Sequence, residues 1–224
     1  MALIHFNDPQ SSFDGIVAVG GSLSTANLVR AYSRGIFPWP INESLLPWFC
    51  PEQRAILEFA NLHIPRSLAK LKRQELFRFT TDLAFPEVIA ACAQISRTGE
   101  TGTWITTEMM HAYCELHEKG YAHSVEAWEG STLVGGLYGV DAGGAFSGES
   151  MFYLRANASK LAFLYLIEHL QKRGLDWIDI QMMTPHMEAL GAKSIDRSEF
   201  LQKLSLALKR KIVLFAATNS LLLA

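Results

Sequence analysis

The sequence is poor in cysteine and has no hydrophobic run long enough to span a bilayer. Its three cysteines, Cys50, Cys92 and Cys114, lie far apart and form no CxxC pair, which indicates reduced thiols rather than a disulfide framework. The longest apolar run, Leu161–Ile167, is far shorter than a membrane helix. The N-terminus shows no basic stretch followed by an apolar one, as a signal peptide would. We therefore expect a cytoplasmic protein that has no membrane span.

Charge of one sign is not in excess either. The 224 residues carry 20 basic and 22 acidic side chains, a net charge of −2, so any contact with nucleic acid must come from a local patch. With 49% hydrophobic and 19% charged residues, the composition is that of a folded globular chain. Its length suits one domain or two small domains in one tight unit.

Several motifs of common enzyme chemistries are absent. The seven histidines show no HExxH or other paired ligand spacing, so we expect no metal site. The chain has no GxxxxGK[ST] phosphate loop, no GxGxxG dinucleotide loop and no GxSxG nucleophile turn. We expect no cofactor.

The order of strand-like and helix-like segments predicts a mixed α+β fold. Three strands separated by turns are expected at residues 124–128, 132–140 and 145–150. A long helix over Asn157–Arg173 and a buried strand over Leu175–Gln181 follow them. This order predicts an antiparallel sheet with a crossover helix on at least one face.

The N-terminal part has a less regular pattern, with helices marked by capping residues. Ser24 is expected to cap a helix that stops at Gly35, Asp82 a helix through Cys92, and Thr106 a helix through Leu116. Residues 35–40 read as a stiff apolar loop. This change in the pattern of predicted elements indicates a boundary near Ile56, with a small N-terminal domain over 1–56 and a second domain over 57–224.

Three polar residues stand at strand positions near the predicted crossover. Asp179 and Gln181 are two apart on one strand and so project from one face, and Glu149 lies at another strand end between a glycine and apolar residues. Such a pair is either hydrogen-bonded in a site or exposed on an edge strand. A second signal is Gly135-Gly136 inside an apolar strand, which marks a bulge, a close approach or a simple bend.

Two further features bear on nucleic-acid contact. Trp39 and Trp104 lie in loops or at helix starts, where tryptophan either packs in the core or stacks on a base. Residues 66–74 read as a basic helix that carries Arg66, Lys70, Lys72 and Arg73. Its face is either a phosphate-binding surface or a solvated one.

Taken together, a series of short motifs resembles the bacterial leucyl/phenylalanyl-tRNA–protein transferase family. The motifs keep their order over nearly the whole chain, and their combination is specific although no single one is. They are AVGG at 18–21, AYSRGIFPW at 31–39, RSL at 66–68, GTWIT at 102–106, HSVE at 123–126, LVGGLYGV at 133–140, GESMF at 148–152, ASK at 158–160 and IDIQ at 178–181.

The resemblance implies an enzyme that moves leucine or phenylalanine from aminoacyl-tRNA to proteins whose N-terminal residue is Arg or Lys, which tags them for N-end rule degradation. It implies a small N-terminal α/β domain followed by a domain like the GNAT (acyl-CoA N-acyltransferase) enzymes. The acetyl-CoA loop of that fold, Q/R-x-x-G-x-G/A, is absent at residues 154–158. A GNAT-fold acetyltransferase that uses CoA is therefore the weaker alternative, beside a tRNA-binding protein without catalysis.

The resemblance also implies roles for individual residues. Asp179, Gln181 and Glu149 would be catalytic, with Asp179 orienting Gln181 to hold the attacking amine; proton transfer through the tRNA ribose hydroxyl is an open alternative. Trp39 and Trp104 would lie near the terminal adenosine. The local excess of positive charge on the basic helix separately predicts that Arg66, Lys70 and Arg73 bind the acceptor stem. The acyl side chain would be held by Leu137, Phe146, Phe163, Leu166 and Ile178, for which plain core packing is the alternative.

Overall fold

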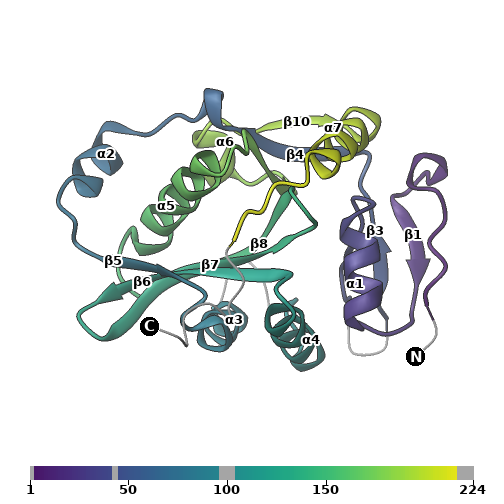
Figure 1. Cartoon of the computed structure of the whole chain (residues 1–224), viewed down its shortest axis with the longest axis horizontal. Helices are drawn as coiled ribbons and strands as arrows, with labels where there is room; N and C mark the ends of the chain where they lie inside the picture. The colour runs from purple at the N-terminus through teal and green to yellow at the C-terminus, as the bar shows by residue number, and fades with distance from the viewer. Residues whose placement is uncertain (1–2, 42–44, 96–103, 216–224) are drawn as a thin grey trace.

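The computed structural model describes residues 3–41, 45–95 and 104–215, which form two sheets flanked by helices (Figure 1). The strands are β1 (Ile16–Val19), β2 (Phe37–Pro38), β3 (Pro47–Phe49), β4 (Gln53–Glu58), β5 (Arg78–Thr81), β6 (Ala122–Glu129), β7 (Thr132–Asp141), β8 (Phe146–Tyr153), β9 (Trp177–Gln181) and β10 (Lys193–Asp196). The helices are α1 (Thr25–Tyr32), α2 (Arg66–Lys72), α3 (Phe85–Gln94), α4 (Thr107–Glu118), α5 (Ala158–Lys172), α6 (Pro185–Ala189) and α7 (Arg197–Arg210). Two short 3₁₀ turns lie at Pro9–Ser11 and Phe59–Asn61.

The larger sheet has seven strands in the order β10-β4-β9-β8-β7-β6-β5. Its neighbours pair antiparallel except β8 and β9, which run parallel because α5 crosses between them. The smaller sheet, β1-β3-β2, stands beside α1 at one end of the molecule (Figure 1). The architecture is mixed α/β.

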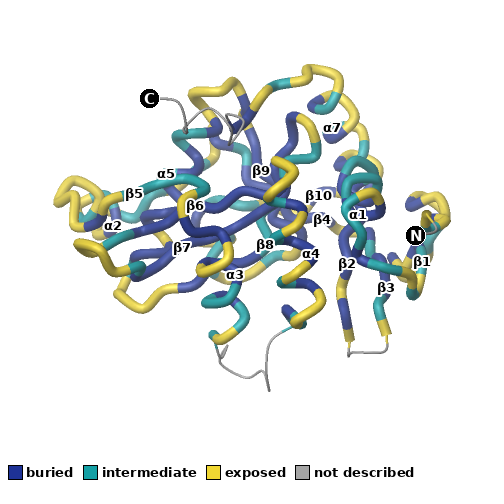
Figure 2. Tube along the Cα trace, turned by 60° about the horizontal axis from the view of Figure 1, so that its bottom comes forward, coloured by how far each residue is buried: buried dark blue, intermediate teal, exposed yellow. Residues whose placement is uncertain are grey.

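Helices cover both faces of the larger sheet, so its central strands are buried (Figure 2). On one face, α5 packs against β6 and β7 and builds a core that includes Val125, Leu137 and Leu166. On the other face, α3 and α4 cover the sheet, and their core runs on without a break into α1 and the smaller sheet. No helix in the described part of the chain is long and apolar enough to cross a membrane.

Most predicted elements of the second half are confirmed. The three antiparallel strands are β6, β7 and β8, the long helix is α5, and the strand after it is β9. Two predicted helix caps are also present: the Ser24 hydroxyl accepts from the N–H of Asn27, and the Thr106 hydroxyl accepts from the N–H of Met109. The loop at residues 35–40 contains the short strand β2.

The predicted cap at Asp82 is wrong. Helix α3 begins at Phe85, with Ala84 at the capping position and no side-chain cap. The Asp82 carboxylate instead accepts a hydrogen bond from the N–H of Ser124 (2.9 Å) and lies 2.8 Å from Nδ1 of His123. Asp82 lies two residues before the capping position, so its side chain ties the turn before α3 to β6 instead of capping the helix.

The Gly135-Gly136 pair marks a close approach of helix to strand. A Cβ atom added at Gly135 would lie 2.5 Å from the Cβ of Ala158, in the first turn of α5. The register of β6 against β7 also shifts beside Gly135, between Ala127 and Trp128, which is the mark of a β-bulge. Glycine here lets α5 lie directly on β7.

Candidate active site

The parallel strands β8 and β9 meet at a single residue pair, Ser147 and Asp179. Two residues beyond this pair each strand carries a polar side chain, Glu149 on β8 and Gln181 on β9. These two are joined by a hydrogen bond of 2.6 Å from Nε2 of Gln181 to Oε1 of Glu149. The end of the parallel pair therefore brings the three predicted catalytic residues together.

Asp179 is buried and bonded on both carboxylate oxygens. Arg54 of β4 donates from Nε to Oδ1 (2.8 Å) and from Nη2 to Oδ2 (2.7 Å), a two-pronged ion pair. The hydroxyl of Ser147 adds a bond to Oδ2 (2.8 Å), and the backbone N–H of Gln181 adds one to Oδ1 (3.0 Å). Each carboxylate oxygen thus accepts two hydrogen bonds.

Arg54 is itself enclosed on every side. Its Nη1 donates to the carbonyl of Gly35 (3.1 Å), and its guanidinium lies 4.7 Å from the ring centre of Phe37 and 4.5 Å from that of Phe200. Burial acts to lower the pKa of Arg54, but the Asp179 carboxylate outweighs it and the pKa rises. Gly35 has a φ of +73°, and a side chain there would meet the ring of Phe200 at 2.7 Å, so only glycine fits.

Glu149 has a different environment. Its Oε1 accepts from the Tyr32 hydroxyl (2.7 Å) as well as from Gln181, while its Oε2 is buried with no hydrogen-bond partner among the described residues. Burial raises the pKa of the Glu149 carboxyl to about 7, and the charge of Asp179 adds to the rise. The hydrogen bonds from Tyr32 and Gln181 act in the opposite direction. This carboxyl can therefore change its protonation state near neutral pH.

Two tyrosines complete the polar network. The hydroxyl of Tyr32 lies 2.5 Å from that of Tyr113 on α4, and both side chains are buried. Burial and the Glu149 charge raise the pKa values of both phenols well above their ordinary value, so both keep their protons. The Tyr32 hydroxyl therefore donates to the titrating carboxyl of Glu149, and the Tyr113 hydroxyl donates to that of Tyr32.

Sequence reasoning missed Arg54, Tyr32 and Tyr113. Tyr32 lies inside the AYSRGIFPW motif, but nothing in its spacing points to Glu149. Arg54 follows the predicted loop and carries no periodic signal. Only the antiparallel pairing of β4 with β9 brings it to Asp179. A buried ion pair between two strands that are far apart in the sequence leaves no local sequence pattern.

The two tryptophans predicted near the adenosine lie together. Their rings stack with centroids 5.5 Å apart and planes 5° from parallel, although Trp39 follows β2 and Trp104 precedes α4. Trp39 is 36% exposed and Trp104 is partly buried. Because each ring already covers one face of the other, an added base would stack on an outer face.

The five predicted acyl-pocket residues are all buried in one hydrophobic cluster, on the α5 side of the larger sheet. They are Leu137, Phe146, Phe163, Leu166 and Ile178. The structure brings them together but gives each a packing role in the core as well.

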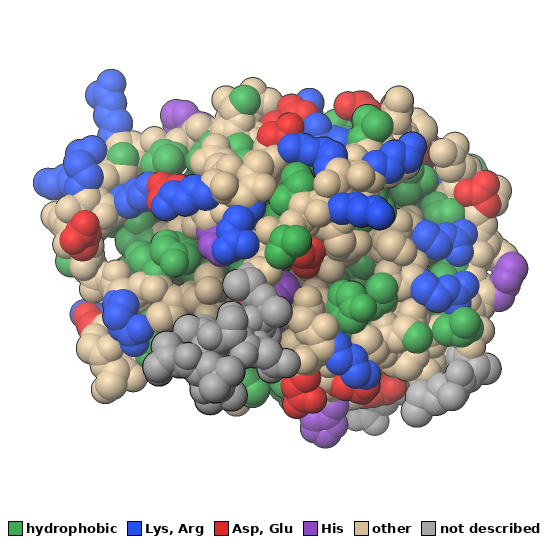
Figure 3. Space-filling view, in the orientation of Figure 1, with side chains coloured by type: hydrophobic (Ala, Val, Ile, Leu, Met, Phe, Trp, Pro, Cys, Tyr) green, Lys and Arg blue, Asp and Glu red, His purple; other side chains and the backbone are tan. Residues whose placement is uncertain are grey.

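The basic helix α2 lies at one edge of the molecule, where Lys and Arg side chains stand out at the upper left of Figure 3. Arg66, Lys70 and Arg73 are exposed, and their spacing of four and three residues places them along one face. The structure records no ion pair between these three and any described residue. Lys72, by contrast, pairs with Glu168 of α5.

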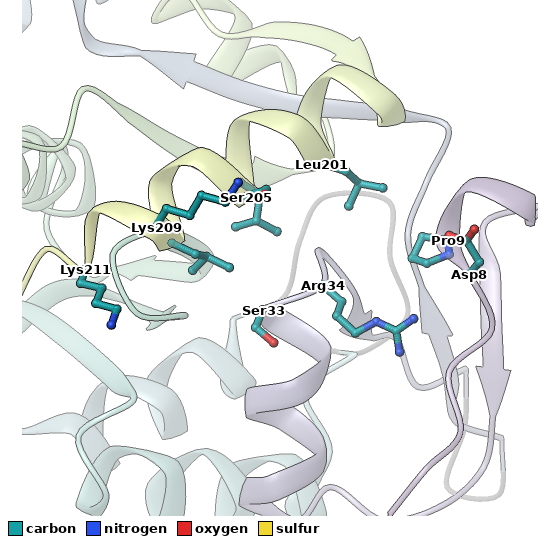
Figure 4. Close-up of a pocket in the computed structure, with 10 residues that line it drawn as sticks. Asp8, Pro9, Ser33, Arg34, Leu201, Ser205, Lys209 and Lys211 are labelled. Carbon is teal, nitrogen blue, oxygen red and sulfur yellow. The ribbon is translucent and has the colours of Figure 1, made fainter.

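Two other polar features lie apart from these residues. Asp82, His117 and His123 each offer a ligand atom within 4.8 Å of the others, but Asp82 already bonds His123, and Nδ1 of His117 lies 2.8 Å from the carbonyl of Ala122. A cleft of about 530 Å³ lies between the end of α1 and α7 (Figure 4). Arg34, Lys209 and Lys211 line it, and none of the predicted site residues does.

The Glu149 carboxyl, with its pKa of about 7, lies beside the ion-paired Asp179, an arrangement that suits general acid–base chemistry. Family profiles described as "Leucyl/phenylalanyl-tRNA protein transferase" and as its "N-terminal domain" match residues 56–205 and 21–52. The chain belongs to the leucyl/phenylalanyl-tRNA–protein transferase family. It is therefore an aminoacyltransferase.

Individual relatives agree with this membership. The chain is 48% identical over 206 residues to the leucyl/phenylalanyl-tRNA–protein transferase of Anaeromyxobacter sp. (strain K), covering 92% of this chain and 88% of that protein. It is 46% identical over 205 residues to the protein of that name from Lawsonia intracellularis, covering 91% and 90%. Among solved structures, L-PGS from Bacillus licheniformis matches with a TM-score of 0.38 and 14% identity over 58% of this chain and 46% of that one, too low to assign a fold.

Proposed function

We propose that this enzyme moves leucine or phenylalanine from aminoacyl-tRNA to proteins that begin with Arg or Lys, as a tag for N-end rule degradation in the cytoplasm. The single observation that carries the choice of site is the Glu149 carboxyl, with its pKa of about 7, joined to Gln181 at the end of the parallel strand pair. Family membership supports the aminoacyl donor.

The proposed reaction depends mainly on how the enzyme positions the acceptor amine against the aminoacyl ester. The α-amine of the acceptor attacks the ester carbonyl that joins the amino acid to the tRNA ribose, so that a C–N bond forms and the ester C–O bond breaks. Holding the amine against the ester supplies much of the rate enhancement, up to ~7–11 kcal/mol in ideal cases. The amine must also lose a proton, and the ribose oxygen must gain one.

We assign the proton to Glu149 and the positioning to Gln181. Glu149 takes the proton from the amine in its ionised form and can return it to the ribose oxygen. Since Nε2 of Gln181 donates to Glu149, the amide oxygen of Gln181 remains to accept from the amine. Asp179, paired with Arg54, orients Gln181, and Glu149 is the carboxylate left to attract a cationic acceptor.

The remaining site residues are proposed to bind the substrates. Trp39 and Trp104 offer an aromatic surface for the terminal adenosine. The buried cluster around Leu137, Phe146, Phe163, Leu166 and Ile178 would accept the apolar side chain. The exposed cations Arg66, Lys70 and Arg73 would hold the acceptor stem.

We also propose a division into a small domain over 1–56 and a GNAT-like domain over 57–224. Two observations support this division. The profile of the N-terminal domain ends at residue 52 and the other profile begins at residue 56, and β3 is the last strand of the smaller sheet along the chain. The proposed boundary lies inside β4, which already belongs to the larger sheet. The β6–β8 meander, the crossover α5 and a strand parallel to β8 at one residue pair support the GNAT-like assignment.

Incubation with phenylalanyl- or leucyl-tRNA and an Arg-starting peptide, followed by mass spectrometry, tests the proposal. We expect a peptide that is heavier by one Phe or Leu residue, with no product when acetyl-CoA is the donor. The Gln181→Ala variant should bind charged tRNA as the wild type does but transfer far more slowly. Transfer to an Asp-starting peptide at the same rate would contradict the proposed acceptor, and an unaffected Gln181→Ala variant would contradict the proposed site.

A further inference from the structure

Arg54 has more contacts than a buried ion pair needs for stability. Both prongs of its guanidinium fork bond Asp179, its third nitrogen bonds the Gly35 carbonyl, and aromatic rings lie against it from β2 and α7. Replacing a buried ion pair by apolar residues is often neutral or stabilising, so stability alone does not explain such a group. The arrangement fixes one orientation of one carboxylate.

That orientation leaves Asp179 no capacity to act on a substrate. Its Oδ1 accepts from Arg54 and the Gln181 N–H, and its Oδ2 accepts from Arg54 and the Ser147 hydroxyl. A carboxylate oxygen offers about two acceptor sites, and here both oxygens are filled. Asp179 can neither take a proton from the acceptor amine nor bind its cationic side chain without losing a bond.

The effect of Asp179 is therefore exerted on Gln181. The backbone of Gln181 has a φ of +61°, which is unfavourable for a residue with a side chain and persists only where neighbouring contacts hold it. The bond from its N–H to Asp179 is such a contact. The turned backbone directs the Gln181 amide to Glu149, where the proposed proton transfer takes place.

We propose that Arg54 is a positioning residue for aminoacyl transfer: it holds Asp179 so that Asp179 holds Gln181 and, through Gln181, Glu149. The inference rests on the proposed assignment of the site to these residues. Arg54 itself touches no substrate. Its contribution is geometric, and a misplacement of about 1 Å at the reacting groups is enough to cost ~10²-fold in rate.

The test compares Arg54→Ala, Arg54→Lys and a matched control, Arg197→Ala. Arg197 is also a buried arginine, but its guanidinium donates to the backbone carbonyls of Pro51, Pro9 and Ser12 and not to a carboxylate of the site. For each variant we would measure the thermal midpoint, and kcat and KM with charged tRNA and an Arg-starting peptide. Each assay is repeated with guanidinium chloride at concentrations that leave the fold intact, and with sodium chloride at the same ionic strength.

We expect kcat of Arg54→Ala to fall ~10²-fold with the KM for charged tRNA unchanged. Guanidinium ion, but not sodium, should restore part of the rate in a saturable way by refilling the vacated site. Arg54→Lys keeps the charge but not the fork, so its kcat should be intermediate and insensitive to guanidinium. Arg197→Ala should lose thermal stability while its folded fraction keeps the wild-type kcat.

Each contrary result overturns the inference. A wild-type kcat in either folded Arg54 variant would show that the fork is not needed. If Arg54→Ala does not fold, Arg54→Lys still decides the question. Loss of kcat without guanidinium rescue, matched by Arg197→Ala, would reduce Arg54 to a packing role. If the wild-type enzyme does not modify the peptide, the proposed function itself is contradicted, and with it the reaction for which Arg54 would position the site.

Discussion

Glu149 and Asp179 are carboxylates on neighbouring strands, yet their surroundings give them opposite properties. Asp179 faces a guanidinium and two further donors, which occupy both of its carboxylate oxygens. Glu149 faces two phenols and one amide, and one of its oxygens has no partner among the described residues. The first can only hold its neighbours in place, and the second can exchange a proton.

The pH dependence of transfer should report Glu149. Its folded pKa of about 7 lies above the ordinary value, so the carboxyl is protonated and inactive below that pH and ionised above it. We expect the rate to rise with pH through about 7, and a second rise near ~8 as the acceptor α-amine loses its proton. Glu149→Gln should slow transfer by ~10²–10⁴-fold and abolish the lower rise while keeping the upper one.

Rate measurements with one Arg-starting peptide over about four pH units centred on the pKa of Glu149 would decide this. The control is Glu149→Asp, which keeps a carboxyl and should keep a titration in that range. If the lower rise persists in Glu149→Gln, it belongs to another group. Tyr32 and Tyr113 are excluded as that group, because the pKa values of both phenols are raised well above their ordinary value.

The sequence indicates the strand residues of this site but not their partners. Two-residue spacing places Asp179 and Gln181 on one face, and both are buried, which rules out the exposed-edge alternative. The same spacing could not show that Gln181 leaves the extended conformation, with a φ of +61° and its N–H bonded to the Asp179 side chain. Nor could it show Arg54, whose position depends on pairing between strands.

At the scale of elements, the predictable segments are those with strong local signals. Strand β6 alternates in polarity, and glycine turns separate β6, β7 and β8. Helix α5 has a long apolar face and is followed by Gly174. The strands β1, β3, β5 and β10 are three or four residues long and were not expected. Such short strands exist because a neighbouring strand supplies their hydrogen bonds, which a single segment does not encode.

The contact between β7 and α5 gives a stability prediction. Gly135→Ala places a Cβ 2.5 Å from that of Ala158 and 3.1 Å from backbone atoms of α5, so helix and strand must separate. We expect a loss of ~1–3 kcal/mol in the free energy of unfolding, measured by urea titration. The matched control is Gly148→Ala on β8, where the nearest atom lies at 3.7 Å and little change is expected. Equal stability of the two variants would show that α5 can shift at no cost.

At the scale of the whole molecule, the charge is small but unevenly placed. The chain is −2 overall, while α2 presents Arg66, Lys70 and Arg73 to solvent. A polyanion such as tRNA would be drawn to such a surface, because bound phosphates release condensed counterions.

Replacing Arg66, Lys70 and Arg73 by alanine should reduce the salt dependence of tRNA binding. We expect the slope of log K against log salt to flatten by about two to three units, equally for all tRNAs, because phosphate contacts carry no sequence information. The control removes Arg34, Lys209 and Lys211, the same charge, from the cleft of Figure 4. If the wild type and the α2 variant have the same slope of log K against log salt, α2 does not bind the acceptor stem. The same conclusion follows if both variants flatten that slope equally.

The contacts of the site join parts of the chain that are far apart. Arg54 and Asp179 are separated by 125 residues, and Tyr32 and Glu149 by 117. Contacts of such range close late, after shorter loops have formed, because chain entropy opposes them. During synthesis the enzyme is therefore without its site until β9 has left the ribosome and paired with β4. A nascent chain that ends before β9 lacks Asp179 and Gln181, and so lacks the proposed site.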